Sequence, residues 1–308
     1  MKYSFSKLQG LGNDFILFDN IGHRTDQHIT LTPQLATQLC DRRFGIGADG
    51  VFSLATAADQ DTADLVWDFY NADGSVAEMC GNAIRCVARY IFDRGLWPLS
   101  AEVDLSEEKN DLDGLSACKR HGTLRIETLA GIKAVTLQFD NNDILQGFRV
   151  DMGIAELGGK VNIAGRDYQR VCVGNPHAVT FVDHLPPEFG SAPVATEGPV
   201  VELDPAFPQK TNVEFVQLMS SDLVYMRVWE RGVGETLACA TGACAVAVAA
   251  HDAGLSGARV TVMQPRGALI VEIADDLRVH LTGPAEGVYL GIWSTLAVVG
   301  DGRTCTKT

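Results

Sequence analysis

The sequence predicts an α+β protein made of two domains with similar α/β topology that face each other across a central cleft. Many short runs of β-branched and aromatic residues alternate with only a few helical patterns. Two long segments also repeat the same motifs in the same order. Finally, a chain of 308 residues is long enough for about two domains.

Short strands are expected along most of the chain because their residues suit a pleated, half-buried surface. They fall at 15–20, 50–55, 65–71, 123–131, 134–139, 177–182, 211–218, 223–231, 258–263, 268–273 and 288–293. Helical periodicity is confined to 33–43, 81–93 and 241–253. The segment 96–122 is acidic and rich in turn residues, so we interpret it as an exposed insertion and assign it no role.

The repeated motifs place one cysteine in each half of the chain. Asn71 lies nine positions before Cys80, and Glu230 lies nine positions before Cys239. Further upstream, the motif LGNDF has a counterpart in VGNPH, and the paired landmarks are about 160 residues apart. We therefore expect duplicated domains that place both cysteines at one shared surface. The first would comprise 1–133 plus 284–308, and the second 134–283.

Composition excludes several classes of partner. A formal net charge of −14 opposes binding to nucleic acid or to anionic membranes. The first residues lack the apolar core of a signal peptide, and no apolar run is long enough to span a bilayer. We therefore expect a cytoplasmic protein whose eight cysteines stay reduced. The cysteine spacings do not match the paired C-x-x-C of a zinc site, and no metal is expected.

The setting of Cys80 and Cys239 points to acid/base chemistry. A cysteine at a helix start lies beside free backbone N–H groups and the positive end of the helix dipole, which favour the thiolate. The same N–H groups can hold a carboxylate. If the two helices converge, a thiolate on one side can remove the α-proton of a bound acid while a thiol on the other side returns one. This exchange inverts the carbon without pyridoxal phosphate.

Five motifs occur in order over nearly the whole chain: GLGNDF, FYNADGSVAEMCGN, GNPHAV, TNVEFV and ERGVGETLACATGACA. Together they resemble the diaminopimelate epimerase family, whose members interconvert LL- and meso-diaminopimelate for lysine and cell-wall precursor synthesis. The resemblance implies two similar domains that close on the substrate. It also implies that the reaction needs neither a cofactor nor a metal. It also implies a homodimer, with Tyr289 as a residue of the subunit contact.

The resemblance also assigns roles to particular residues. It implies that Cys80 and Cys239 are the two acid/base residues and that His177 and Glu230 assist them. The side chains that would hold the substrate, chiefly at its distal end, are Asn13, Asn71, Asn175, Asn212, Glu230 and Arg231. The backbone donors that would hold the reacting carboxylate belong to Gly81, Asn82, Ala240 and Thr241.

The chain departs from the family pattern at a few positions. It has CGNA and ACATGA where many members have CGNG and ACGTGA, but alanine keeps its N–H and we expect little loss. Gly50 stands where some members have a glutamine that contacts the substrate, which puts that contact in doubt.

GIGADG, at 45–50, formally satisfies the G-x-G-x-x-G pattern of dinucleotide sites. That fingerprint must follow a strand and open a helix, whereas this motif follows a helical pattern and leads into a strand. We interpret it as a helix-to-strand turn.

Two other functions stay open. The first is a racemase of another amino acid, such as histidine, on the same scaffold. Arg231, with Asn71 and Asn212, favours a substrate with a distal carboxylate, because a guanidinium pairs well with one. The second is a non-catalytic redox-sensing protein in which the two cysteines form a regulatory disulfide.

Overall fold

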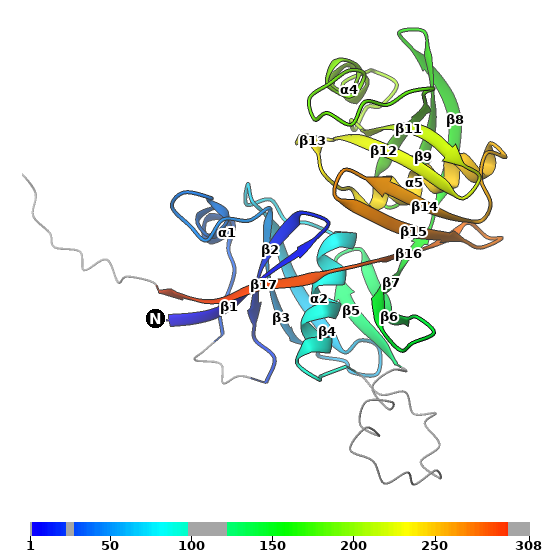
Figure 1. Cartoon of the computed structure of the whole chain (residues 1–308). Coiled ribbons are helices and arrows are strands. Elements are labelled where there is room, and N and C mark those ends of the chain that lie inside the picture. Colours follow the sequence, from blue (N-terminus) through cyan, green and yellow to red (C-terminus); the bar gives the residue numbers. More distant parts are fainter. Residues whose placement is uncertain (1, 23–27, 98–121, 295–308) are drawn as a thin grey trace, which may run out of the picture.

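The computed structural model describes residues 2–22, 28–97 and 122–294 and confirms the expected α+β class (Figure 1). Its helices are α1 (Pro33–Cys40), α2 (Gly81–Asp93), α4 (Val194–Glu202) and α5 (Ala240–Asp252). Its strands are β1 (Lys2–Gly10), β2 (Asn13–Asp19), β3 (Gly50–Thr56), β4 (Leu65–Asn71), β5 (Thr123–Thr128), β6 (Gly131–Phe139), β7 (Leu145–Ile154), β8 (Glu156–Ile163), β9 (Arg166–Cys172), β10 (Pro176–Phe181), β11 (Asn212–Ser220), β12 (Leu223–Glu230), β13 (Gly234–Thr236), β14 (Arg259–Gln264), β15 (Gly267–Ile273), β16 (Arg278–Gly283) and β17 (Glu286–Ser294).

One half of the molecule wraps a sheet around α2. Its strands pair in the spatial order β17, β1, β2, β3, β4, β5, β6, β7. The pairs β2–β3 and β4–β5 are parallel and the others are antiparallel. Helix α2 packs on strands from both ends of this order, β1 and β17 at one end and β6 and β7 at the other. The sheet therefore encloses the helix that Cys80 precedes.

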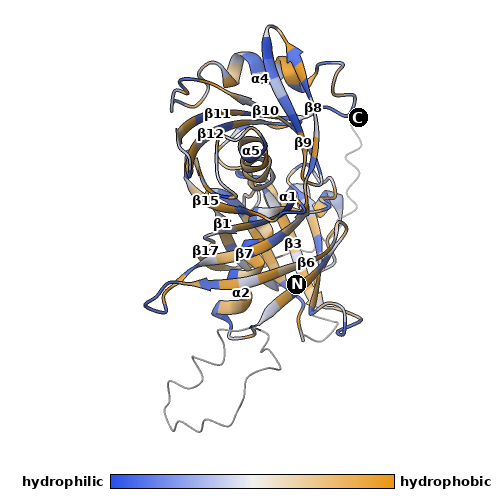
Figure 2. Cartoon of the chain, turned by 90° about the vertical axis from the view of Figure 1, so that its right-hand side faces the viewer, coloured by the Kyte–Doolittle hydropathy of each residue, from blue (hydrophilic) through white to orange (hydrophobic). Residues whose placement is uncertain are grey.

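The other half repeats this arrangement around α5. Its strands pair in the order β8, β9, β10, β11, β12, β14, β15, β16, and its parallel pairs, β10–β11 and β12–β14, occupy the same places in the order. Figure 2 looks along α5 and shows the strands around it. The repeated sequence of pairings matches the motif repeat and supports a duplicated fold.

The two halves join where β7 pairs with β16. After β16 the chain crosses back to the first half as β17, which pairs with β1 (Figure 1). The expected boundary after residue 133 falls inside β6, whose partners β5 and β7 both belong to the first half. The domain division stays a prediction, and we propose moving its boundary to Ala155, between β7 and β8.

Small side chains let α5 lie at the centre of its half. Every residue from Gly242 to Ala250 is buried, and all of them are Gly, Ala, Val or Cys. A helix that is apolar on all sides is stable only when it is enclosed. Helix α2 is enclosed in the same way but carries one charged residue, Arg85, at its core.

The three helices expected from periodicity are present, and α4 is an addition. Gly198 and Pro199 lie inside α4 and obscure its helical signal. The unexpected strands are β1, β7, β8, β9, β13 and β16. The turn at 45–50 leads from α1 into β3, as expected. Most of the acidic insertion lies outside the described residues.

None of the helices in the described ranges has the length and apolar character needed to cross a bilayer. Within those ranges, no three His, Cys, Asp or Glu side chains gather in a way that could hold a metal ion.

Candidate active site

The two cysteines cap two helices whose N-termini meet. Cys80 is the N-cap of α2 and Cys239 is the N-cap of α5, and both have extended backbone angles. The first helical residues, Gly81 and Ala240, lie against each other. A Cβ added to Gly81 would lie 2.8 Å from the Cβ of Ala240, closer than two such atoms can approach. Glycine at position 81 therefore allows the helix ends to converge.

A cavity of about 700 Å³ opens at this meeting point, between residues from both halves. Both cysteines line it, and so do most of the other residues expected at the site: Asn13, Asn71, Gly81, Asn82, Asn175, Glu230, Arg231, Ala240 and Thr241. His177 and Asn212 do not line it. The cavity has the usual size of a site for a small molecule.

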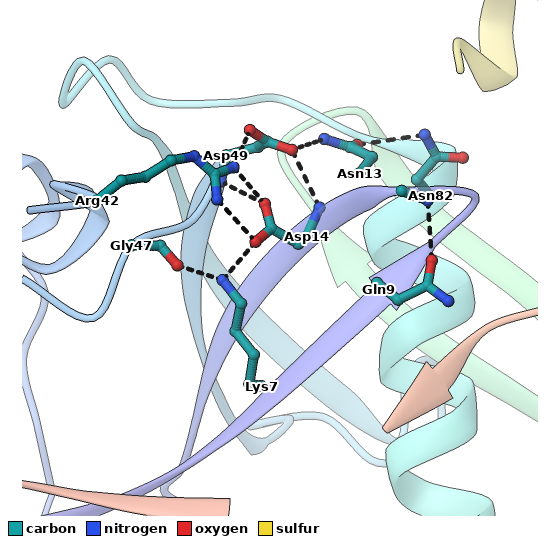
Figure 3. Close-up of polar contacts among 9 residues, drawn as sticks. Lys7, Gln9, Asn13, Asp14, Arg42, Gly47, Asp49 and Asn82 are labelled. Carbon is teal, nitrogen blue, oxygen red and sulfur yellow. Dashed lines mark hydrogen bonds and ion pairs between the residues drawn. The ribbon is translucent and has the colours of Figure 1, made fainter. Parts of the chain in front are cut away.

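Polar side chains from the first half surround Cys80. Its Sγ lies 3.8 Å from Oδ1 of Asn13. The same oxygen accepts a hydrogen bond from Nδ2 of Asn82 at 3.2 Å (Figure 3). Nδ2 of Asn13 donates to Asp49 at 2.8 Å, so the amide is fixed with its oxygen towards the sulfur. Burial raises the pKa of the Cys80 thiol and nearby Glu230 raises it further, while the N–H groups of Ala83 and Asn82 act in the opposite direction.

A charged network holds Asp49 in place. Arg42 bridges Asp49 and Asp14, at 2.7 and 2.6 Å, and Lys7 pairs with Asp14 at 2.6 Å (Figure 3). Burial alone would raise the pKa of Asp14, but the hydrogen bonds from Arg42 and Lys7 outweigh it and lower the pKa to about 2. Asp14 is therefore ionised at neutral pH, and the network is a rigid support for Asn13.

Cys239 has a different environment. Its Sγ accepts a hydrogen bond from the N–H of Gly242 at 3.3 Å and lies 3.5 Å from Oγ1 of Thr241. Burial, together with the charges of Glu230 and Glu214, raises the pKa of this thiol well above its usual value. The two thiols therefore share Glu230 as a neighbour, but only Cys239 also has Glu214.

Glu230 is suited to exchange a proton with the thiols. It ends β12, lines the cavity, and accepts a hydrogen bond from the hydroxyl of Thr236. Burial raises the pKa of its carboxyl group, and the charge of Glu214 adds to this shift. A carboxyl group with a raised pKa can act as either acid or base nearer neutral pH.

His177 lies behind the cavity wall. It is almost fully buried on β10, with Nδ1 at 2.6 Å from Oε1 of Glu214 and Nε2 at 2.8 Å from Oδ1 of Asn175. Asn175 lines the cavity, so it links His177 to the site. Among the described residues, His177 has no hydrogen bond to either thiol, and its expected assistance is not direct in this conformation.

Glu214 was not expected at the site, although it lies within the quoted motif TNVEFV. It is fully buried on β11, and its second carboxylate oxygen has no hydrogen-bond partner among the described residues. A Glu between Val213 and Phe215 in a strand looks like a solvent-facing position in the sequence. Its burial beside α5 depends on the tertiary packing, which periodicity does not reveal.

Of the remaining expected residues, Arg231 and Asn71 line the cavity, whereas Asn212 bonds to backbone groups. Asn212 donates to the carbonyl of Pro176 at 3.0 Å and accepts from the N–H of Arg231 at 3.0 Å, so both ends of its amide hold backbone. The side chain of Arg231 lines the cavity and donates to the carbonyl of Gln209 at 3.2 Å. Asn71 donates to Ser75 at 3.0 Å at the cavity wall.

Gly50 and Tyr289 lie away from the cavity. Gly50 is buried in β3, where an added Cβ would come within 2.7 Å of the Phe69 ring, so a side chain here would need local rearrangement. Tyr289 is on β17, half exposed, with its ring edge-on to that of Phe5.

Solved structures with a similar fold are found at low sequence identity. A PhzF-family phenazine biosynthesis protein of Bacillus anthracis matches with a TM-score of 0.65 and 13% identity, over 96% of this chain and 100% of that one. A hydroxyproline epimerase of Agrobacterium vitis matches with a TM-score of 0.62 and 14% identity, over 94% of this chain and 92% of that one. At these identities the likeness shows the fold alone.

The sequence comparisons identify the family. The family model described as diaminopimelate epimerase matches residues 5–158 and 170–288. The diaminopimelate epimerase of Pelotomaculum thermopropionicum is 40% identical over 93% of this chain and 97% of its own length. That of a Synechocystis species is 43% identical over 94% of this chain and 99% of its own length. With a family model over most of its length and such relatives, this chain belongs to the diaminopimelate epimerase family.

Proposed function

We propose that this protein epimerises LL-diaminopimelate to meso-diaminopimelate by a cofactor-independent, two-thiol mechanism, in lysine and peptidoglycan precursor synthesis. The observation that carries the proposal is the placement of Cys80 and Cys239 as N-caps of two converging helices that border one cavity. The names of the relatives support the substrate.

The helix ends would hold the reacting end of the substrate. The first N–H groups of a helix have no acceptor within the helix, so those of Gly81, Asn82, Ala240 and Thr241 are available to the α-carboxylate. As the α-proton leaves, negative charge spreads from the α-carbon onto this carboxylate. The converging helix N-termini stabilise that charge with donors that need no reorganisation.

The two thiols would act on opposite faces of the α-carbon. One sulfur, as thiolate, takes the α-proton, and the other, as thiol, delivers its proton to the opposite face and is left as thiolate. The next turnover requires the proton to return across the site. Glu230 is placed to exchange it, because it neighbours both thiols and has a raised pKa.

The distal end of the substrate would lie against polar groups on the cavity wall. The Arg231 guanidinium suits its carboxylate, and Asn71 and Asn175 can bind its ammonium group, while Glu230 would contact the reacting end. Asn212 would act by holding the backbone of Arg231, since both ends of its amide are already bonded. His177 would hold Asn175 from behind.

Hydrogen exchange in deuterated water tests the reaction and the substrate together. The reduced protein is incubated separately with LL-diaminopimelate, histidine and lysine, and loss of the α-proton signal is followed by NMR. We expect rapid exchange with diaminopimelate alone. Exchange with histidine instead would favour the racemase of another amino acid, and exchange with none would favour the redox sensor.

Cysteine variants test the two thiols in the same assay. Cys80→Ser and Cys239→Ser should each slow epimerisation by about 100-fold or more, since each removes one acid/base group. Cys172→Ser is the matched control, because Cys172 is a thiol on β9 that does not line the cavity. Full activity in either active-site variant would contradict the proposed mechanism.

We also propose that the protein acts in the cytoplasm, where its thiols would stay reduced, and that it works as a homodimer. Cell fractionation checks the location: recovery in an oxidising compartment would oppose it.

A further inference from the structure

Arg85 is a buried cation with no carboxylate partner. It is, with Arg227, among the largest fully buried side chains of the described residues, and its exposed fraction is 0%. Its nitrogens donate to the carbonyl of Gly81 at 3.1 Å, to Oδ1 of Asn82 at 2.8 Å and to the carbonyl of Pro284 at 3.1 Å. Among the described residues, no carboxylate comes within 4.0 Å of it. A buried guanidinium without a counter-ion is unusual.

The charge lies directly behind the first turn of α2. Gly81 and Asn82, which accept two of its hydrogen bonds, are the first two residues after Cys80. The Asn82 amide then donates to Asn13, whose oxygen faces the Cys80 sulfur. Arg85 therefore orients the polar groups around Cys80 and adds a positive charge to the same helix end.

The other half has nothing equivalent. When α2 and α5 are aligned on their N-caps, Arg85 corresponds to Cys244, a fully buried thiol. The duplicated site is thus asymmetric in charge. One helix end has a buried cation behind its thiol, while the other has the carboxylate of Glu214 beside its thiol.

The other titratable groups near the thiols are Glu230 and, on the Cys239 side, His177, whose Nδ1 lies 2.6 Å from Oε1 of Glu214. Glu230 acts on both thiols, so it shifts them in the same direction. The groups that face Arg85 are the thiols of Cys80, Cys86 and Cys244. Lys133, from β6, also lines the cavity, but the charges that act on it are Asp151 and Arg278.

We propose that Arg85 is a positioning residue that makes the two thiols unequal, so that Cys80 is the more acidic one and forms the thiolate first. The inference rests on the proposed function for its consequence in catalysis, but the inequality itself does not require epimerase activity. Burial and the charge of Glu230 raise the pKa of both thiols. In addition, the charge of Arg85 lowers the pKa of Cys80, whereas the charge of Glu214 raises that of Cys239. Burial lowers the pKa of Arg85 itself, but a guanidinium starts far above neutrality and keeps its proton.

Alkylation by iodoacetamide measures each thiol separately. The reagent reacts with the thiolate, so the pH midpoint of the alkylation rate reports the acidity of each thiol. Peptide mass spectrometry distinguishes Cys80 from Cys239 and from the other cysteines. The midpoints are compared rather than the rates, because the rates also depend on access. In the unmodified protein we expect Cys80 to titrate at lower pH than Cys239.

Substitutions at position 85 then assign the cause. Arg85→Met removes the charge and keeps the length, and it should lower the thiolate fraction of Cys80 by about tenfold at a fixed pH, without moving Cys239. Arg85→Lys keeps the charge and should restore most of the difference. Arg89→Met is the matched control, because Arg89 lies on the same helix but is solvent-accessible and paired with Asp93.

The outcomes separate the inference from the proposed function. A Cys239 midpoint at or below that of Cys80 in the unmodified protein would overturn the inference, even if Arg85→Met fails to fold. An unchanged Cys80 midpoint in folded Arg85→Met would reduce Arg85 to a structural residue. If Cys80 titrates at lower pH than Cys239 but no substrate proton exchanges, the role of Arg85 is supported and the epimerase proposal is contradicted.

Discussion

At the level of single residues, Glu230 links the two thiols. It is the carboxylate that acts on both Cys80 and Cys239, and its burial raises its pKa above the usual value of 4.5. The folded protein therefore holds this proton more tightly than the unfolded chain does. Stability from protonated Glu230 is fully present below pH 4.5 and is lost as the pH rises through the raised pKa.

The Glu230→Gln variant tests this linkage. Gln resembles the protonated form and does not ionise. The free energy of unfolding of the variant, relative to that of the parent, should therefore increase as the pH rises from about 5 to about 8. Urea unfolding at both pH values measures the difference. Glu78→Gln, at an exposed carboxylate on the same cavity, should show a smaller change. The same difference at both pH values would contradict the raised pKa.

Residue-level prediction from the sequence was strongest where a motif was long. Cys80 and Cys239 could be predicted because matched surroundings distinguished them from Cys86 and Cys244, which the structure buries inside the helices. Arg85 and Glu214 could not be predicted as site residues. A polar residue at a helical or strand position looks solvent-facing until the enclosing sheet is known.

At the level of elements, the meeting of α2 and α5 determines the site. The sequence predicted both helices to within about one residue, because a run of helix-compatible, mostly apolar residues follows each cysteine. It did not predict that the helix ends touch, since that contact depends on two sheets wrapped around them. It also missed strands such as β8, where Gly158, Gly159 and Lys160 interrupt the alternation.

The contact between Gly81 and Ala240 can be tested by exchanging its methyl group. Gly81→Ala should force the helix ends apart and reduce kcat/KM by about 100-fold, since a displacement of about 1 Å at a reacting centre has that effect. Ala240→Gly alone should be tolerated. The double variant moves the methyl from one helix to the other and should recover much of the loss.

A double-mutant cycle on kcat/KM and on the free energy of unfolding measures this recovery. Additive effects of the two substitutions would mean that the helix ends do not press on each other. A Cβ added to Gly81 would also lie 3.2 Å from Cε of Met152, but this flexible side chain can shift in the Gly81→Ala variant.

At the level of the whole molecule, two copies of one topology share a cavity. The sequence predicted the duplication from motif order alone, and the strand pairings repeat in the same order. The predicted boundary after residue 133 stays a prediction, although β6 and β7 continue the first sheet across it. The return of the chain as β17 then binds the halves together.

β17 suits a subunit contact, because it carries exposed apolar side chains on both faces. Val288, Leu290 and Ile292 alternate along the strand with Tyr289, and clustered exposed apolar side chains often mark an interface. Sedimentation velocity should show a dimer that Tyr289→Ala weakens. Phe44→Ala, at an aromatic that is 93% exposed in another region, should leave the dimer intact. A monomer at all concentrations would contradict the homodimer.

In the proposed mechanism, one thiol removes the substrate proton and the other supplies a new one. Following the early reaction of LL-diaminopimelate in deuterated water, with deuterium measured separately in the meso product and in the recovered LL substrate, tests this division of labour. Two thiols should give a product with one deuterium at the inverted carbon and a recovered substrate with almost none. Deuterium appearing equally early in both pools would exclude the two-thiol mechanism, because a single base would then serve both faces.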